Sequence, residues 1–191
     1  MDRGMSDYLY TVAVVAVTFV GFSTVFVTFR EALGGTMSKY DVLLIHNILY
    51  LGVTTIVGCL LPPLLGLLGA GADLTVRVSG LTVAVPMLVF SVLYPKSRHE
   101  ATGRPMPKRV WIDIGLVYAA ATLLVVNASG VVVTPSLAVH ALGVTVLLVA
   151  IFLAFLFGLD LLPSEPAKPV ESETTRESAA SARPRRRASR P

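Results

Sequence analysis

The sequence has few charged residues for its length. Only 15% of its 191 residues are Asp, Glu, Lys or Arg, against about 25% in soluble domains. In contrast, 54% of the residues are hydrophobic and the mean hydropathy is +0.72. A surface that faces water needs charge, so this composition excludes one or two ordinary soluble domains and indicates a protein embedded in lipid.

Residues that carry catalysis or bind metals are also scarce. The single cysteine, Cys59, cannot form an internal disulfide, and three scattered histidines give no metal-ligand spacing. No nucleophile elbow, zinc-protease helix or phosphate-binding glycine loop is present. We therefore expect no catalytic residue, no metal and no cofactor, and a protein that is not an enzyme. A membrane enzyme acting on lipids has no residue in its support.

What the chain does contain is long apolar runs. A helix needs about 20 mostly apolar residues to cross roughly 30 Å of hydrocarbon. Five such runs cover about residues 8–29, 42–61, 74–94, 112–133 and 137–160. The sequence predicts an all-α integral membrane protein, a bundle of five transmembrane helices within residues 1–162.

Local signals at the ends of these runs predict where the helices begin and end. Pro62-Pro63 predicts that the second helix ends there, because proline cannot continue a helix without loss. The next segment, Leu64–Leu68, is then either an interfacial turn or a short re-entrant segment. Thr134-Pro135 predicts the start of the fifth helix, and Asp73 has the spacing to pair with Arg77 on one helical face.

Basic residues are distributed unevenly, and they indicate orientation because Lys and Arg are retained on the cytoplasmic side during insertion. With five spans and the N-terminus outside, 14 of the 16 basic residues fall on the inner side, five of them between Lys96 and Arg109. Only Arg3 and Arg77 remain outside. We therefore predict an outside N-terminus and a cytoplasmic C-terminus. The chain resembles small multi-pass proteins of the bacterial inner membrane in general character, so we expect the plasma (inner) membrane. The excess of arginine (12) over lysine (4) fits a GC-rich genome.

The last segment, residues 163–191, differs in composition from the rest. It is rich in Ser, Thr, Glu, Pro, Ala and Arg and has no aromatic residue. Such a segment cannot bury enough apolar area to offset the entropy of ordering, so we expect a disordered basic tail. Its cations are either simply solvated or contact anionic lipids. The candidates for anionic-lipid contacts, in the tail and elsewhere, are Arg98, Arg104, Lys108, Arg109, Arg185, Arg186 and Arg187. We expect no nucleic-acid partner.

No Asp, Glu, Lys or Arg lies near the middle of a span. A proton-coupled carrier or an ion pump usually needs one, so these classes are disfavoured. The weaker polar candidates are His46, Asn47 and Tyr50 near the inner end of the second span, and Asn127 and His140 toward the outer side. They either anchor helices at the interface and bond between helices, or line a polar pathway.

Small residues let helices approach closely in lipid. A stripe on the first span, here called the compact stripe, is expected to face partner helices; it consists of Thr11, Val14, Thr18, Gly21, Val25 and Thr28. Further candidates for helix packing are Gly58, Gly115, Ala150, Ala154 and Gly158. These residues serve either one bundle or a homo-oligomer.

Two functional classes remain for a protein of this kind. The favoured class is a non-enzymatic membrane subunit or accessory protein that acts through contacts with lipid, a second copy or a membrane-protein partner. The alternative is a small transporter or channel formed by oligomerisation, with His46, Asn47, Tyr50 and Asn127 along the path. An odd number of spans disfavours a carrier built from an inverted repeat.

Overall fold

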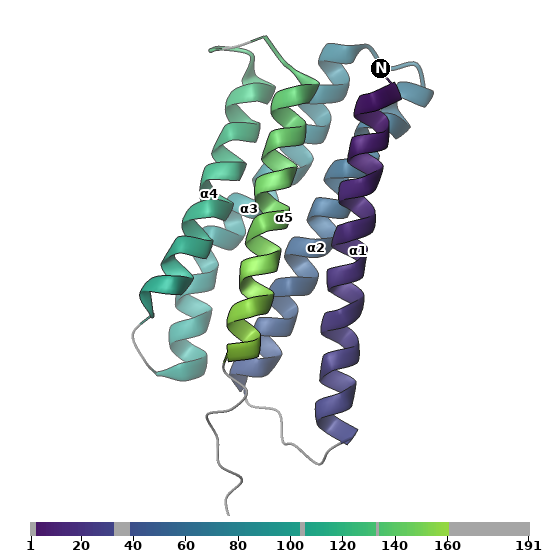
Figure 1. The fold of residues 1–191 in the computed structure, drawn as a ribbon. Helices are drawn as coiled ribbons and strands as arrows, with labels where there is room; N and C mark the ends of the chain where they lie inside the picture. Colours follow the sequence, from purple (N-terminus) through teal and green to yellow (C-terminus); the bar gives the residue numbers. More distant parts are fainter. Residues whose placement is uncertain (1–2, 33–38, 104–105, 133, 161–191) are drawn as a thin grey trace, which may run out of the picture. The chain divides into compact units, whose positions relative to one another are not determined.

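Five α-helices account for most of the chain in the computed structural model of the protein, which describes residues 3–32, 39–103, 106–132 and 134–160 (Figure 1). The helices are α1 (Arg3–Ala32), α2 (Lys39–Leu67), α3 (Ala72–Thr102), α4 (Lys108–Ser129) and α5 (Leu137–Asp160). Each contains an apolar stretch of 21 to 29 residues, long enough to cross a bilayer. By helix length and hydropathy this is a multi-pass membrane protein, and the prediction of an all-α fold with five such helices is confirmed.

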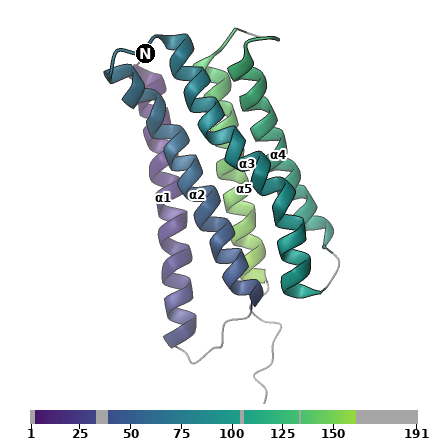
Figure 2. The ribbon, with the colours of Figure 1, turned by 180° about the vertical axis from the view of Figure 1, so that it is seen from behind.

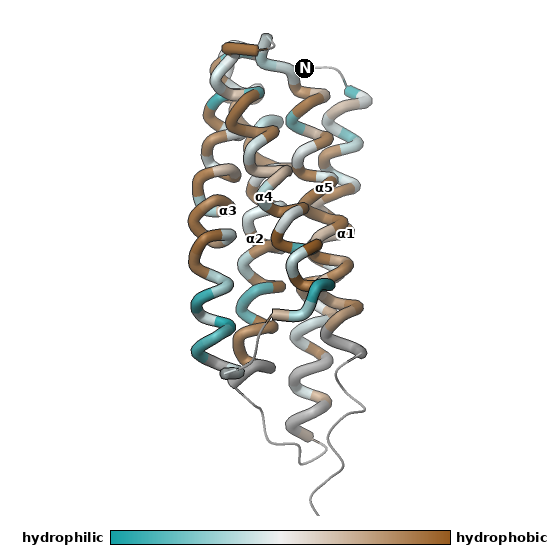
Figure 3. The backbone as a smooth tube through the Cα atoms, turned by 90° about the vertical axis from the view of Figure 1, so that its left-hand side faces the viewer, coloured by the Kyte–Doolittle hydropathy of each residue, from teal (hydrophilic) through white to brown (hydrophobic). Residues whose placement is uncertain are grey.

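Consecutive helices run in opposite directions within the unit Met1–Leu159 (Figures 1 and 2). Side-by-side packing joins α1 to α2, α2 to α3, and α3 to α4. α5 contacts α1 through Tyr8 and Thr145, and it contacts α2 through His140 and Gly58. We call the end where α3 passes into α4 the basic end, and the opposite end, where α1 begins, the N-terminal end. Hydrophilic residues gather toward the basic end of α3, whereas hydrophobic residues predominate along the spans (Figure 3).

Three hydrophobic clusters of buried residues form the core, and α5 belongs to the two larger ones. The largest cluster joins four helices, with Leu51 from α2, Met87 from α3, Leu124 from α4 and Ile151 from α5 among its fully buried members. The second joins α1, α2 and α5 around Leu9, Cys59 and Val144. Glycine permits the closest approaches. A Cβ at Gly58 would lie 2.6 Å from Cγ2 of Val83, and one at Gly143 would lie 2.7 Å from Cδ2 of Leu124.

Most hydroxyl groups in the helices bond within their own helix. Each donates to the carbonyl four residues earlier, as lipid requires, because no water is present there to accept the bond. The donors are Thr11, Thr18, Ser23, Thr24, Thr28, Thr55, Thr75, Thr82, Ser91, Ser97, Thr102, Thr122 and Thr145. The hydroxyl hydrogens of these residues are therefore used within their own helices, although a hydroxyl oxygen can still accept a bond, as that of Thr145 can from Tyr8.

The prediction that the second helix ends at Pro62-Pro63 is wrong. α2 continues through both prolines to Leu67. It ends in a Schellman motif, in which Gly69 has a φ of 78° and the Ala70 N–H donates to the Leu65 carbonyl at 3.0 Å. Leu64, Leu65 and Leu67 thus belong to the last turn of α2, Leu68 follows in the turn, and the segment is not re-entrant.

The predicted start of the fifth helix is also wrong by two residues. α5 begins at Leu137, and the first bond of its opening turn runs from the His140 N–H to the Ser136 carbonyl at 3.1 Å. Asn127 of α4 binds the backbone of Ser136. Neither Thr134 nor Pro135 therefore opens this helix.

The compact stripe of α1 lies on the outside of the bundle. Val14 and Val25 are each 65% exposed, and a Cβ added to Gly21 would meet no atom within 4 Å. The side of α1 that packs against the bundle carries Leu9, Val12, Ala13, Ala16 and Ser23. The prediction that the compact stripe packs against the other helices of the bundle is therefore wrong. Both faces of α1 are apolar, so either face can contact lipid.

Candidate functional site

The most deeply buried polar contact joins α5 to α2. His140 is 0% exposed, and its Nε2 lies 2.9 Å from the Gly58 carbonyl oxygen. In a regular helix this carbonyl would accept from the N–H of residue 62, which is proline and has none. Since a carbonyl can only accept, Nε2 carries the hydrogen. The His140 ring therefore replaces the helical donor that is missing at Pro62.

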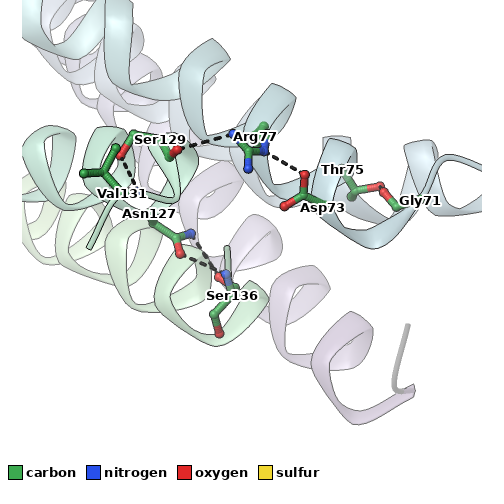
Figure 4. A network of polar contacts seen from close by, with 8 residues as sticks. All are labelled: Gly71, Asp73, Thr75, Arg77, Asn127, Ser129, Val131 and Ser136. Atoms are coloured by element: carbon green, nitrogen blue, oxygen red, sulfur yellow. Dashed lines mark hydrogen bonds and ion pairs between the residues drawn. The ribbon is translucent and has the colours of Figure 1, made fainter. Parts of the chain in front are cut away.

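A network of polar contacts links α3, α4 and the start of α5 at the N-terminal end (Figure 4). Arg77 Nε donates to Asp73 at 2.7 Å, which confirms the pairing expected from their spacing. Its Nη1 donates to the Ser129 carbonyl at 3.3 Å, in the last turn of α4. Arg77 thus joins α3 to a helix end whose carbonyls have no partner within the helix.

Asn127 fixes the segment between α4 and α5. Its Nδ2 donates to the Ser136 carbonyl at 3.0 Å, and its Oδ1 accepts from the Ser136 N–H at 2.9 Å (Figure 4). The residue is 1% exposed. Both amide atoms of Asn127 are therefore used to hold the backbone that opens α5.

The other three polar candidates lie on α2, in its half toward the basic end. Tyr50 donates to the Pro86 carbonyl at 3.1 Å and stacks on Phe90 with ring centroids 5.5 Å apart. His46 is exposed and its Nδ1 lies 2.9 Å from the Val42 carbonyl of its own helix. Asn47 is 4% exposed, and its Oδ1 has no hydrogen-bond partner among the described residues. These three side chains lie together, but on the opposite half of the bundle from Asn127 and His140.

A groove of about 570 Å³ lies between α2 and α3 where these three residues gather. Its lining consists of Leu43, His46, Asn47, Leu49, Tyr50, Val53, Val89, Phe90, Leu93, Tyr94 and Ser97. Polar atoms are confined to a few of these side chains. The groove is apolar with a small polar section, and such a lining suits a ligand that is mostly hydrocarbon.

A buried ionisable group lies near the start of α4. Asp113, in the second turn of α4, is 5% exposed, and its Oδ1 has no hydrogen-bond partner in the described part of the chain. It follows Val110 and precedes Ile114, which pack with Tyr94 of α3. Asp113 lies only five residues after the start of α4, and its burial depends on packing between helices that spacing along the sequence does not reveal.

The remaining candidates are placed as follows. Gly58, Ala150 and Ala154 are buried in the bundle, whereas Gly115 faces outward with no atom within 4 Å of an added Cβ. Gly158 lies in α5, but its surroundings are outside the described part. Among the cations, Arg98 is buried, and Lys108 and Arg109 are exposed in the first turn of α4. Arg104, Arg185, Arg186 and Arg187 fall outside the described residues.

No cluster of three or more His, Cys, Asp or Glu side chains arranged to hold a metal ion occurs within the described residues. No family model, no curated protein and no solved structure matches the chain. Its class is therefore defined by the fold, a multi-pass membrane protein with five apolar helices.

Proposed function

We propose that the protein is a non-enzymatic membrane subunit that acts through helix contacts with a second copy of itself or with another membrane protein. The observation that carries this proposal is the outward position of the compact stripe on α1. Helices associate in lipid where small side chains let their backbones approach. A face of this kind that is left open by its own bundle favours association with a further helix.

The chemistry of the stripe supports this role. Its three threonines, Thr11, Thr18 and Thr28, donate to carbonyls of α1 itself at 2.8 to 3.1 Å. The face therefore carries no unsatisfied donor that a solute pathway would use. The open space at Gly21 gives a partner helix a point of closest approach.

We also propose that the basic end faces the cytoplasm and that the N-terminal end faces outward. Among the described residues near its helix ends, the basic end carries Lys96, Arg98, Lys108 and Arg109. The N-terminal end carries Arg3 and Arg77, and the latter is paired with Asp73. Retention of cations on the inner side would then give the orientation of a plasma-membrane protein with its C-terminus in the cytoplasm.

Two outward-facing glycines provide the test of the association. Gly21→Leu fills the compact stripe, whereas Gly115→Leu makes the same change on α4, and neither Cβ meets an atom within 4 Å. The mass of the protein with its partners is measured by light scattering after extraction in a mild detergent. We expect Gly21→Leu to shift the mass to the single chain and Gly115→Leu to leave it unchanged. A wild-type protein that is a single chain without partners, or a complex that both variants retain, contradicts the proposal.

A further inference from the structure

The groove between α2 and α3 is independent of the compact stripe and lies on a different pair of helices. It is formed on α2 by residues from Leu43 to Val53 and on α3 by residues from Val89 to Ser97. Figure 2 shows these two helices side by side on the near face of the bundle. Because Val53, Val89 and Leu93 are exposed, the groove opens sideways, toward the surrounding lipid.

The length of the groove matches one leaflet of a bilayer. Ten residue steps separate Leu43 from Val53, which corresponds to about 15 Å along a helix. Half of a hydrocarbon core of roughly 30 Å is also about 15 Å. A transmembrane helix with its side chains is about 10 Å wide, whereas a lipid chain is narrower, and its upper part fits along the apolar section of this groove.

The floor and the walls of the groove suit hydrocarbon. Tyr50, Phe90 and Tyr94 form a continuous aromatic series, with ring centroids 5.5 Å and 5.1 Å apart. The Tyr50 hydroxyl is already bonded to the Pro86 carbonyl, so it places no free donor in the groove. Val53 and Val89 line the end of the groove that lies farthest from the basic end, and this section is apolar.

The polar section lies at the basic end. Asn47 is 96% buried and lines the groove, and its Oδ1 has no hydrogen-bond partner among the described residues. A buried acceptor of this kind is costly unless a donor reaches it. His46 and Ser97 lie in the same section of the lining.

The charge around this section is positive. The described charged side chains at the basic end are Lys96, Arg98, Lys108, Arg109, Glu100 and Asp113, four cations against two acids. Lys96 follows Leu93 by three residues, which places it on the same face of α3 as the groove. A ligand with a negative charge close to a hydroxyl group complements both Lys96 and Asn47.

We propose that this groove binds one phospholipid with an anionic, hydroxyl-bearing headgroup. One acyl chain lies along Val53, Val89 and Leu93 over the aromatic floor. The phosphate lies near Lys96, and a headgroup hydroxyl donates to Asn47 Oδ1. Binding a lipid here stabilises the contact between α2 and α3, and it does not depend on any association through α1.

Native mass spectrometry of the full chain, delipidated in detergent, tests the proposal with three lipids of identical acyl chains. Phosphatidylglycerol has the charge and the hydroxyl, phosphatidylmethanol has only the charge, and phosphatidylcholine has neither an acidic headgroup nor a hydroxyl. We expect occupancy to fall in that order, by about tenfold between the first and the last, the size of one charge-assisted contact. Equal occupancy by phosphatidylglycerol and phosphatidylcholine overturns the proposal.

Neighbouring residues provide a matched pair of variants. Leu93 lines the groove and is 55% exposed, whereas Val92 is 72% exposed and does not line it. Leu93→Trp should remove phosphatidylglycerol binding, and Val92→Trp should retain it. Asn47→Leu should abolish the preference for phosphatidylglycerol over phosphatidylmethanol while leaving chain binding intact. Phosphatidylglycerol binding that persists in Leu93→Trp overturns the proposal, as does a photoreactive residue at Val89 that cross-links to a protein rather than to a lipid.

Discussion

Several polar side chains between the helices bind backbone atoms at places where a helix lacks its usual partner. His140 binds the Gly58 carbonyl, which Pro62 cannot serve. Arg77 binds the Ser129 carbonyl at the end of α4, and Asn127 binds the backbone of Ser136 before α5. Because backbone groups at helix ends and beside prolines lack a donor or acceptor within the helix, each of these side chains supplies a partner for such a group.

The contact between His140 and Gly58 yields a double-mutant prediction. His140→Leu should lower the free energy of unfolding by about 1–2 kcal/mol, because the Gly58 carbonyl loses its only described donor. In a Pro62→Ala background the helix regains an N–H for this carbonyl, so the same change should cost about 1 kcal/mol less. Unfolding by SDS in mixed micelles measures both values. Strictly additive effects would mean that the ring does not replace the proline's missing donor.

At the scale of the helices, the charge-free runs were sufficient to predict the number and approximate position of the helices, because lipid imposes length and hydropathy directly. The end of α2 was not predictable in the same way. Pro62-Pro63 is a local stop signal, and the donor that replaces the missing N–H of Pro62 comes from His140, 82 residues from Gly58. Contacts of that range are invisible to patterns read along one segment.

The sequence also does not predict which face of α1 packs against the bundle. Both of its faces are apolar, so no hydropathy contrast marks the side that packs inward. The size of its side chains predicts that the compact stripe packs inward, yet the packed side carries Leu9, Val12, Ala13 and Ala16. The partners of the polar candidates were not predictable either. Asn127 and His140 bind backbone atoms of other segments, and the groove beside Asn47 depends on how α2 and α3 lie together.

Two phenylalanines on α1 test which face of that helix packs. Phe19 contacts Phe152 and Phe155 of α5, with ring centroids 5.6 and 5.9 Å apart, whereas Phe22 is 59% exposed. Phe19→Ala should reduce the free energy of unfolding by about 1–3 kcal/mol, given what aromatic pairs contribute. Phe22→Ala should change it by less than about 0.5 kcal/mol, as surface substitutions do. The opposite ranking in thermal unfolding would place the other face of α1 against α5.

For the molecule as a whole, we expect five membrane crossings, with the basic end and the N-terminal end on opposite sides of the membrane. The N-terminal end includes the start of α1 and the connections from α2 to α3 and from α4 to α5 (Figure 1). The basic end includes the connection from α3 to α4 with its cations. An odd number of spans requires that the ends of α1 and α5 nearest the termini lie on opposite sides.

Reporter fusions test the number of crossings and the orientation. A phosphatase active only outside and a fluorescent protein active only in the cytoplasm are each fused at residues 35, 70, 102 and 135. We expect fusions at 35 and 102 to fluoresce and fusions at 70 and 135 to give phosphatase activity. This alternation follows from five crossings with the basic end inward. Adjacent positions that report the same side would contradict the five crossings, and a complete reversal would contradict the orientation.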